Sequence, residues 1–198
     1  RPVPLEIKTI SYPDKSNPFL FERSLEPKVK EIILRYGDGK QCIVFCSSKR
    51  NAENQASKLS EQHTIPFRQP PPTLTTELAA ISNPTSRTLA QQGYGFHHSG
   101  LSPDDRTLIE HLFSCGYIQI LCSTTTLAQG MNLPAHLVVI KGTNSWRGSD
   151  KGYENISRSD VIQMLGRAGR PGYDVQGKAV IMTSRENESY YAGIGLNA

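Results

Sequence analysis

Short apolar runs rich in β-branched residues recur along the chain and predict strands. The run Cys42-Ile43-Val44-Phe45-Cys46 is continuously apolar, as expected for a strand that is buried on both faces of a sheet. Similar runs predict strands over residues 5–10, 41–46, 94–97, 117–122, 136–141 and 178–183. Strands buried on both faces are typical of parallel sheets that helices cover from two sides.

Between these runs, apolar residues recur at helical spacing. Stripes of this kind occupy residues 29–36, 52–59 and 108–113. Ser102 and Pro103 mark the start of the last of these helices, as a capping residue followed by proline. A helix over residues 77–91 must bend or break near Pro84, because proline removes a helical hydrogen bond. The alternation of strands and helices predicts an α/β fold in a single domain, with a parallel sheet flanked by helices on both faces.

Two segments depart from this alternation. Residues 63–76 contain Pro66 and the run Pro70-Pro71-Pro72, which predict a surface loop. Residues 142–157 are polar and bear glycines, and they include Trp146 and Tyr153. Neither segment continues the strand and helix pattern.

A helix is predicted to begin at Ser157, which can form a capping box with Asp160. One face of that helix would carry the apolar residues Val161, Met164, Leu165 and Ala168, and the opposite face would present Gln163, Arg167 and Arg170. Gly166 and Gly169 each cost about 1 kcal/mol relative to alanine within a helix, so another surface or a ligand is expected to approach the backbone there. Pro171-Gly172 would end the element.

The two arginines of this face allow two interpretations. Guanidinium groups held near one another suit a polyphosphate, because each fork binds phosphate oxygens and stays charged. In phosphoryl transfer, such arginines stabilise charge on the γ-phosphoryl group. A solvated face with Arg167 and Arg170 in surface salt bridges accounts for the same pattern equally well, so the pattern alone leaves both open.

Composition narrows the picture only slightly. The 198-residue chain has a net charge of +4, which permits a phosphate-bearing partner without requiring one. The cysteines Cys42, Cys46, Cys115 and Cys122 lack the companions of a zinc site and are predicted to be free, mostly buried thiols in a reducing compartment. No apolar run is long enough to span a membrane, and no signal segment opens the sequence. Both ends are expected to be cuts within a longer protein.

Four segments, in order along the chain, resemble motifs of superfamily 2 helicases of the Ski-like (DExH) group. Residues 43–50 (IVFCSSKR) resemble motif IV, and residues 97–101 (HHSGL) resemble the group's His-His-Ala-Gly-Leu signature. Residues 124–135 (TTTLAQGMNLPA) resemble motif V, and residues 163–171 (QMLGRAGRP) resemble motif VI. The resemblance spans nearly the whole chain and implies the second RecA-like domain of such a helicase.

This resemblance implies roles for particular residues. Catalytic residues at ATP would be Arg167, Arg170 and Gln163, and contacts to ATP would come from Gly130, Asn132, Gln163, Arg167 and Arg170. Contacts to nucleic acid would come from Ser47, Ser48, Arg50, His98, Ser99, Thr124, Thr125 and Trp146. Structural alternatives stay open: a threonine after the strand can simply cap a helix, Trp146 can pack on its own domain, and the histidine pair can be structural. No metal site is predicted.

A complete ATP site is not predicted in this chain. Gly37-Asp38-Gly39-Lys40 is followed by Gln41 and therefore lacks the hydroxyl of a phosphate loop, and no Asp-Glu-x-His segment is present. In the resembling group these parts, and the Mg²⁺ that accompanies ATP, belong to the first RecA-like domain. The chain alone is therefore expected neither to hydrolyse ATP nor to unwind duplexes.

Residues 137–143 and Trp146 are most similar to the meiotic crossover DNA helicases, and the group carries a strand-parting β-hairpin at about residues 141–157. The resemblance implies a nuclear, ATP-dependent DNA helicase of the 3'-5' type in meiotic recombination, acting on single strands and branched duplexes. Its partners would be the first RecA-like domain of the same protein and recombination or mismatch-repair-type proteins, with no membrane partner. A spliceosomal or activating-signal-cointegrator type helicase is the alternative, as is a protein-docking module.

Overall fold

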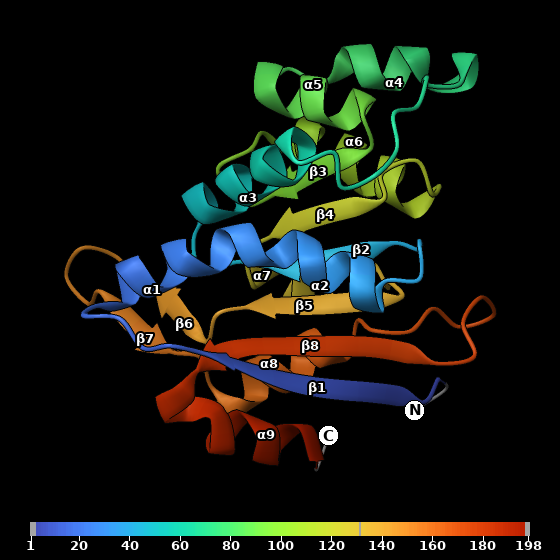
Figure 1. Cartoon of the computed structure of the whole chain (residues 1–198). Helices are drawn as coiled ribbons and strands as arrows, with labels where there is room; N and C mark the ends of the chain where they lie inside the picture. Colours follow the sequence, from blue (N-terminus) through green and yellow to red (C-terminus); the bar gives the residue numbers. More distant parts are fainter. Residues whose placement is uncertain (1–2, 131, 197–198) are drawn as a thin grey trace.

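Parallel strands form the centre of the fold. In the computed structural model, which describes residues 3–130 and 132–196, six strands pair in the order β1-β8-β5-β2-β4-β3, and each pairing is parallel (Figure 1). In that order the strands are β1 Leu5–Tyr12, β8 Gly177–Ser184, β5 Leu137–Lys141, β2 Cys42–Phe45, β4 Ile120–Ser123 and β3 Tyr94–His97. The predicted α/β fold with a RecA-like parallel sheet is confirmed.

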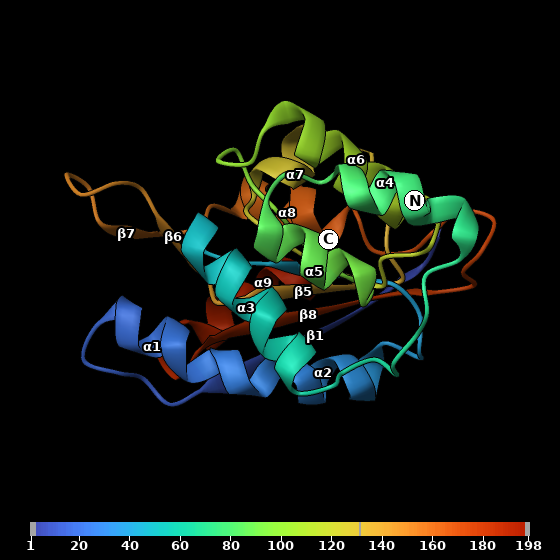
Figure 2. The same ribbon diagram turned by 90° about the horizontal axis from the view of Figure 1, so that it is seen from above.

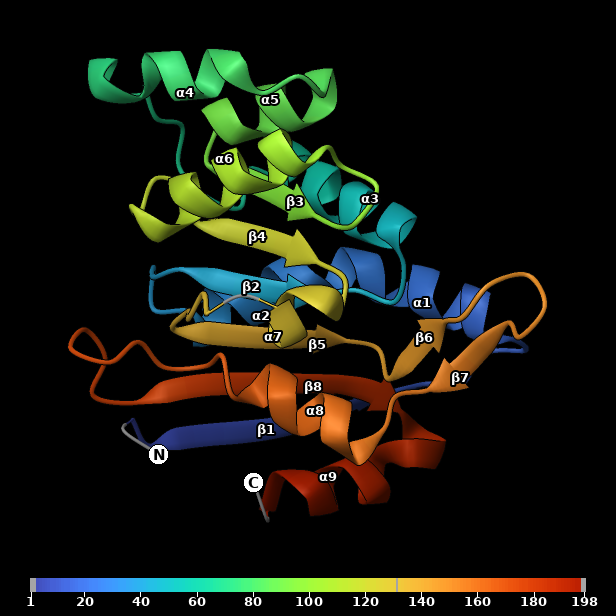
Figure 3. The same ribbon diagram turned by 180° about the vertical axis from the view of Figure 1, so that it is seen from behind.

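Helices cover both faces of this sheet (Figure 2). One face carries α1 Pro18–Leu25, α2 Val29–Tyr36 and α3 Lys49–Glu61. The other face, in front of the sheet in Figure 3, carries α4 Thr75–Ala80, α6 Pro103–Ser114, α7 Thr126–Gly130, α8 Arg158–Leu165 and α9 Glu188–Leu196. Helix α5 Pro84–Gln91 contributes to both cores, and short 3-10 turns lie at Glu26–Lys28, Pro72–Leu74 and Arg185–Asn187.

The central strand β2 explains the continuous apolar run. Ile43 and Phe45 pack in the core on the α6 face, whereas Cys42 and Val44 pack in the core on the α2 face. All four side chains are buried, because helices cover the sheet on both sides. A strand in this position needs apolar residues at every position and not only at alternate ones.

The break predicted near Pro84 is confirmed. Helix α4 ends at Ala80, and α5 begins at Pro84, with the Asn83 side chain accepting a hydrogen bond from the Ser86 amide at 2.9 Å. The strand predicted over 117–122 begins later, at Ile120. Its first residues instead complete the end of α6, where the amides of Tyr117 and Ile118 both donate to the Leu112 carbonyl.

The sequence analysis missed helix α1, in which apolar residues are not confined to one face. Phe21 and Leu25 are buried, but Phe19 and Leu20 are exposed and Glu22 is buried, so the apolar stripe is short and includes a carboxyl group. Asn17 caps its first turn by accepting a hydrogen bond from the Leu20 amide at 2.9 Å. Helix α9 was missed as well, and it packs against the outer strand β1.

The predicted extent of the helix that starts at Ser157 was wrong. Helix α8 ends at Leu165, so Arg167 and Arg170 follow the helix and do not lie on its face. The chain leaves α8 through two tight turns, in which the amides of Arg167 and Ala168 donate to the carbonyls three residues earlier. At Gly169 the backbone adopts φ +90°, which ends the helical path.

A small antiparallel hairpin projects from the carboxyl ends of the parallel strands (Figure 1). It consists of β6 Asn144–Trp146 and β7 Tyr153–Asn155, which pair with Trp146 opposite Tyr153. These strands lie within the 141–157 segment, directly after β5. The hairpin therefore stands at the same edge of the sheet as the loops that follow β2 and β4.

Cys42, Cys46 and Cys122 are buried and Cys115 is exposed, and all four are free thiols, as predicted. None of the described helices has the length and apolar character needed to cross a membrane.

Candidate nucleic-acid and ATP interfaces

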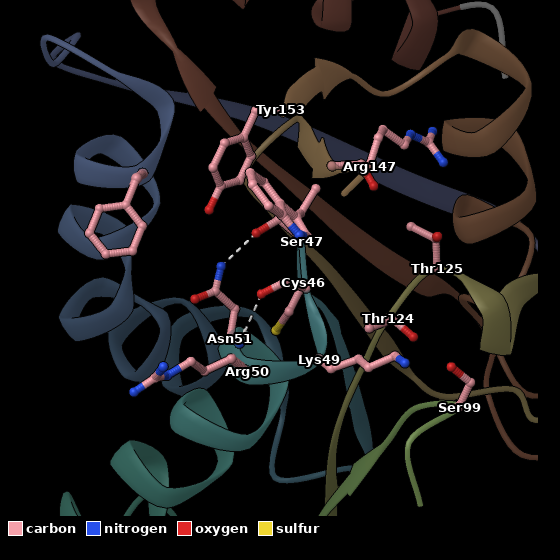
Figure 4. A pocket seen from close by; sticks show the side chains of 14 residues that line it. Cys46, Ser47, Lys49, Arg50, Asn51, Ser99, Thr124, Thr125, Arg147 and Tyr153 are labelled. Carbon is pink, nitrogen blue, oxygen red and sulfur yellow. Dashed lines mark hydrogen bonds between the residues drawn. The ribbon is translucent and has the colours of Figure 1, made fainter. Parts of the chain in front are cut away.

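A groove of about 840 Å³ lies at the carboxyl ends of β2, β4 and β5 (Figure 4). The loops after β2 and β4 form one side, and the hairpin and α1 form the other. Its lining residues are Phe19, Cys46, Ser47, Ser48, Lys49, Arg50, Asn51, Ser99, Thr124, Thr125, Ser145, Trp146, Arg147 and Tyr153. Open parallel sheets place their ligands at this edge, because the loops that leave the strands converge there.

The side formed by the β2 loop is polar and basic. Ser48 caps α3 by accepting a hydrogen bond from the Asn51 amide at 3.1 Å, and the Asn51 side chain donates to the Ser47 hydroxyl at 2.6 Å (Figure 4). These bonds fix both serines at the N-terminus of a 13-residue helix. Lys49 and Arg50 add positive charge at the same place, so this side suits phosphate oxygens.

The side formed by the hairpin and α1 is aromatic. Trp146 is 45% exposed and meets Tyr153 edge to face, with ring centroids 5.1 Å apart. Phe19 of α1 is 51% exposed and lines the same groove. The Trp146 amide donates to the Ser47 carbonyl at 3.0 Å, which ties the hairpin to the β2 loop. Trp146 thus packs on its own domain and still presents part of its ring to the groove.

The groove includes residues that the sequence analysis missed. Lys49 stood between two predicted residues, and Arg147 and Tyr153 flank Trp146 or pair with it, so the motif positions could have drawn attention to them. Phe19 could not have been found, because α1 itself was not predicted.

The histidine pair is buried beneath the groove. His97 lies 2.8 Å from Glu110, and the Nδ1 atom of His98 accepts a hydrogen bond from the Gly100 amide at 3.0 Å. Burial lowers the pKa of His98, although Glu53 acts in the opposite direction. The structure therefore gives no support to a direct contact between His98 and nucleic acid, whereas its neighbour Ser99 is exposed and lines the groove. Within residues 3–130 and 132–196, no cluster of three metal-ligating side chains occurs.

Residues predicted at ATP lie at the far end of α8. Arg167 donates through Nη1 to the Asn132 side chain at 3.3 Å and through Nη2 to the Ala128 carbonyl. Gly130 is exposed at the last residue of α7, and Gln163 is exposed on the last turn of α8. The hydrogen bonds of Arg167 therefore join the segment after α8 to the segment after α7.

Arg170 is separate from this group. Its backbone amide, Nε and Nη2 donate to the Asp174 carboxylate at 2.8, 2.9 and 3.0 Å. The Asp174 side chain is fully buried. Burial alone would raise the pKa of Asp174, but the hydrogen bonds and the charge of Arg170 lower it to about 2. The prediction that Gln163, Arg167 and Arg170 share one helix face is therefore wrong, and Arg170 forms an internal ion pair.

A glycine is required at position 169 because other parts of the same chain pack closely against it. A Cβ atom at this position would lie 2.9 Å from the Val3 side chain and 3.3 Å from the Cα atom of Gly177. Its amide donates to the Ala135 carbonyl at 2.7 Å, which bonds the turn to the segment before β5. The surface that approaches this glycine belongs to the same domain and not to a ligand.

Comparisons with known proteins show the family to which the sequence is similar. The family described as helicase conserved C-terminal domain matches residues 74–172, which is half of the chain. The ATP-dependent DNA helicase homolog MER3 of Arabidopsis thaliana is 39% identical over 202 residues, covering 98% of this chain and 18% of that protein. MER3 of Saccharomyces cerevisiae is 39% identical over 181 residues, covering 90% of this chain and 14% of that protein.

More distant relatives carry other names. Activating signal cointegrator 1 complex subunit 3 of Dictyostelium discoideum is 37% identical over 196 residues, covering 96% of this chain and 9% of that protein. The chain thus spans less than a fifth of the length of the relatives it matches. The family model matches half of the sequence, and the parallel sheet carries the motifs. This chain therefore belongs to the family of helicase conserved C-terminal domains.

Proposed function

We propose that this chain is the C-terminal motor half of an ATP-dependent DNA helicase that acts in meiotic recombination, with 3'-5' polarity. One observation carries the proposal: seven of the eight residues predicted to contact nucleic acid line a single groove. They are Ser47, Ser48, Arg50, Ser99, Thr124, Thr125 and Trp146. They come from segments far apart in the sequence, so their convergence is a property of the fold.

The two sides of the groove suit the two parts of a single strand. The N-terminus of α3, with Ser48 and Lys49, suits the phosphate backbone, because hydroxyls, amides and cations bind phosphate oxygens without reading sequence. Trp146, Tyr153 and Phe19 suit the bases, since every base has a face that can stack on an aromatic ring. A paired duplex would not offer its bases to these rings.

Towards ATP, this chain would contribute the positive charge of an arginine, and it contains no phosphate-loop motif. Arg167 lies beside Asn132, close to the exposed Gly130 and Gln163, and we infer that its guanidinium stabilises charge on the γ-phosphoryl group. ATP, with Mg²⁺ held by a first RecA-like domain, would supply the free energy for movement along the strand. The chain alone is inactive as an ATPase under this proposal.

The intact protein would act in the nucleus, with the first RecA-like domain as its obligatory partner. Recombination or mismatch-repair-type proteins are further proposed partners. The alternative is the corresponding domain of an RNA or DNA helicase of the spliceosomal or activating-signal-cointegrator type, since a relative with the latter name is 37% identical.

The test uses the intact helicase with Lys49→Ala, and with Lys58→Ala on the same helix α3 as the matched control, because Lys58 does not line the groove. Lys49→Ala should weaken single-strand binding and reduce the dependence of log affinity on log salt by about 0.7, as expected for one lost phosphate contact. Lys58→Ala should change neither. Equal effects of the two variants would refute the groove as the binding site, and tighter binding of RNA than of DNA strands would favour the alternative.

A further inference from the structure

A charged cluster lies at the amino ends of β2, β5 and β8, opposite to the groove. At its centre is Asp174, whose carboxylate receives three N–H groups of Arg170. On its other side, the Nδ1 atom of His136 lies 3.0 Å from Asp174 Oδ1, and the ammonium of Lys40 lies 3.7 Å away. Asp38 binds the far side of His136 at 2.8 Å. Asp174, whose own side chain is buried, is therefore held from two directions.

The pairing uses one particular edge of the Arg170 side chain. Oδ2 of Asp174 accepts from the Arg170 backbone amide and from Nε, and Oδ1 accepts from Nη2. Nη1 takes no part in this pairing. Because the guanidinium is planar, engaging the Nε–Nη2 edge sets the direction of the remaining N–H groups.

Arg170 lines a cavity of about 410 Å³. Asn132, one of the residues predicted at ATP, lines the same cavity. Tyr173 lies beside it, with its ring centroid 5.7 Å from Arg170 Cζ. The Arg170 side chain is 19% exposed, whereas the Asp174 side chain that it binds is fully buried.

We propose that Asp174 is a positioning residue that fixes Arg170 with its Nη1 edge toward the Asn132 cavity, ready to bind a phosphate oxygen of ATP. This inference rests on the proposed function, because it assumes that Arg170 acts on ATP. Asp174 itself touches no ligand. Its three acceptor contacts bind both the backbone and the side chain of Arg170, so the direction of the guanidinium is set before any ligand arrives. An arginine on a flexible side chain would have to be ordered during each catalytic cycle instead.

The experiment measures strand-stimulated ATP hydrolysis by the intact helicase with Asp174→Asn, Arg170→Ala and the double variant. Asp174→Asn should lower kcat about 10²-fold, the usual effect of a misplaced catalytic group, while KM for ATP and single-strand affinity change less than about threefold. The double variant should be no slower than Arg170→Ala alone, because Asp174 acts only through Arg170.

The matched control is Asp38→Asn, which alters the same network but touches His136 and Lys178 instead of Arg170. It should leave kcat within about threefold of the unmodified enzyme. If Asp174→Asn fails to fold, Asp174→Glu gives the same test, since the added methylene group displaces the carboxylate that holds the Nε–Nη2 edge while Arg170 is unchanged, and kcat should again fall about 10²-fold.

Three outcomes would overturn the inference, and they separate it from the proposed function. If Arg170→Ala leaves kcat unchanged, the proposed action of Arg170 on ATP fails, and the inference fails with it. If Arg170→Ala slows the enzyme but neither Asp174→Asn nor Asp174→Glu does, only the positioning role is wrong. If Asp38→Asn lowers kcat as much as Asp174→Asn, the whole network acts through stability, and Asp174 has no special role.

Discussion

The structure gathers seven of the eight residues predicted to contact nucleic acid at one edge of the sheet, but it does not place the arginines predicted at ATP on one helix face. At the carboxyl edge of the sheet, six residues from three motifs, together with Trp146, meet in one groove. The other edge carries Arg167 and Arg170 and is called the arginine edge. Both arginines were expected on one helix face, yet α8 ends before either of them. Arg167 bonds to the α7 segment, and Arg170 pairs with Asp174. The residues of the groove were named from the resemblance to helicase motifs, whereas the shared face of the two arginines was predicted from helical periodicity.

This difference shows which kind of inference is robust. Parallel strands bring their carboxyl ends to one edge whatever the details of the loops, so residues just after strands converge by topology. Helical periodicity holds only while the helix lasts, and helix ends are set by capping and by tertiary contacts. Within residues 163–170 those contacts come from Ala135, Val3 and Gly177, none of which a local pattern can reveal.

The largest effect should come from Arg167, which tests whether the arginine edge acts on ATP at all. Arg167→Ala in the intact helicase should lower kcat for ATP hydrolysis at saturating DNA strand by about 10³-fold or more, as for other arginines that stabilise a transferring phosphoryl group. Single-strand affinity, measured by fluorescence anisotropy, should stay within about threefold, since Arg167 lies outside the groove. A collapse of strand affinity with unchanged kcat would reverse the assignment of the two edges.

The next effect concerns Glu22, a carboxyl buried beside the groove. Burial raises its pKa to about 8, although the charge of Lys141 acts in the opposite direction. The folded state therefore holds this proton more tightly than the unfolded chain, and stability is lost as pH rises from about 4.5 to 8. Glu22→Gln should remove this loss and raise the free energy of unfolding at pH 8 by on the order of 3 kcal/mol. Thermal unfolding of the unmodified protein and of Glu22→Gln between pH 5 and pH 9 would measure this difference in stability.

The pKa of Asp174, at the arginine edge, is shifted in the opposite direction to that of Glu22. Its pKa is lowered to about 2, so its contribution to stability is complete above about pH 4 and is lost as pH falls toward 2. Unfolding curves of the unmodified protein should therefore show two separate losses, one on the acid side and one on the basic side. A Glu22→Gln protein that keeps the basic-side loss would contradict the assignment to Glu22.

Gly169 tests whether the arginine edge is shaped by the chain's own packing. Gly169→Ala should lower the free energy of unfolding by about 2 kcal/mol, because φ +90° is strained for alanine and the new methyl group would crowd Val3 and Gly177. Gly116→Ala is the matched control, since φ is +87° there but no atom lies within 4 Å of the added Cβ. It should cost about 1 kcal/mol from backbone strain alone. If chemical denaturation showed equal losses of stability for Gly169→Ala and Gly116→Ala, packing against Val3 and Gly177 would not explain the need for Gly169.

The sequence predicted the strands well because burial on both faces leaves an unambiguous apolar run, as in β2. It predicted the break at Pro84 because proline acts locally. It missed α1, where Phe21 and Leu25 form a short apolar stripe, because Phe19 is exposed and Glu22 is buried against that pattern. It also missed the partner of Arg170, since Asp174 is recognised as important only when its burial is known.

The smallest effect should come from Trp146, where the groove's aromatic side can be tested alone. Trp146→Ala should weaken single-strand binding by about 1 kcal/mol, roughly fivefold, at the low end for base stacking because Tyr153 already covers part of the ring. Phe67→Ala removes an aromatic side chain that is 84% exposed and lies outside the groove, and it should leave binding unchanged. A strand without bases should bind the unmodified protein less tightly by at least the same factor, and Trp146→Ala should weaken the binding of that strand no further. If the Trp146→Ala variant instead binds both strands as tightly as the unmodified protein, the ring packs only on its own domain, and recognition at this edge depends on the phosphate side of the groove.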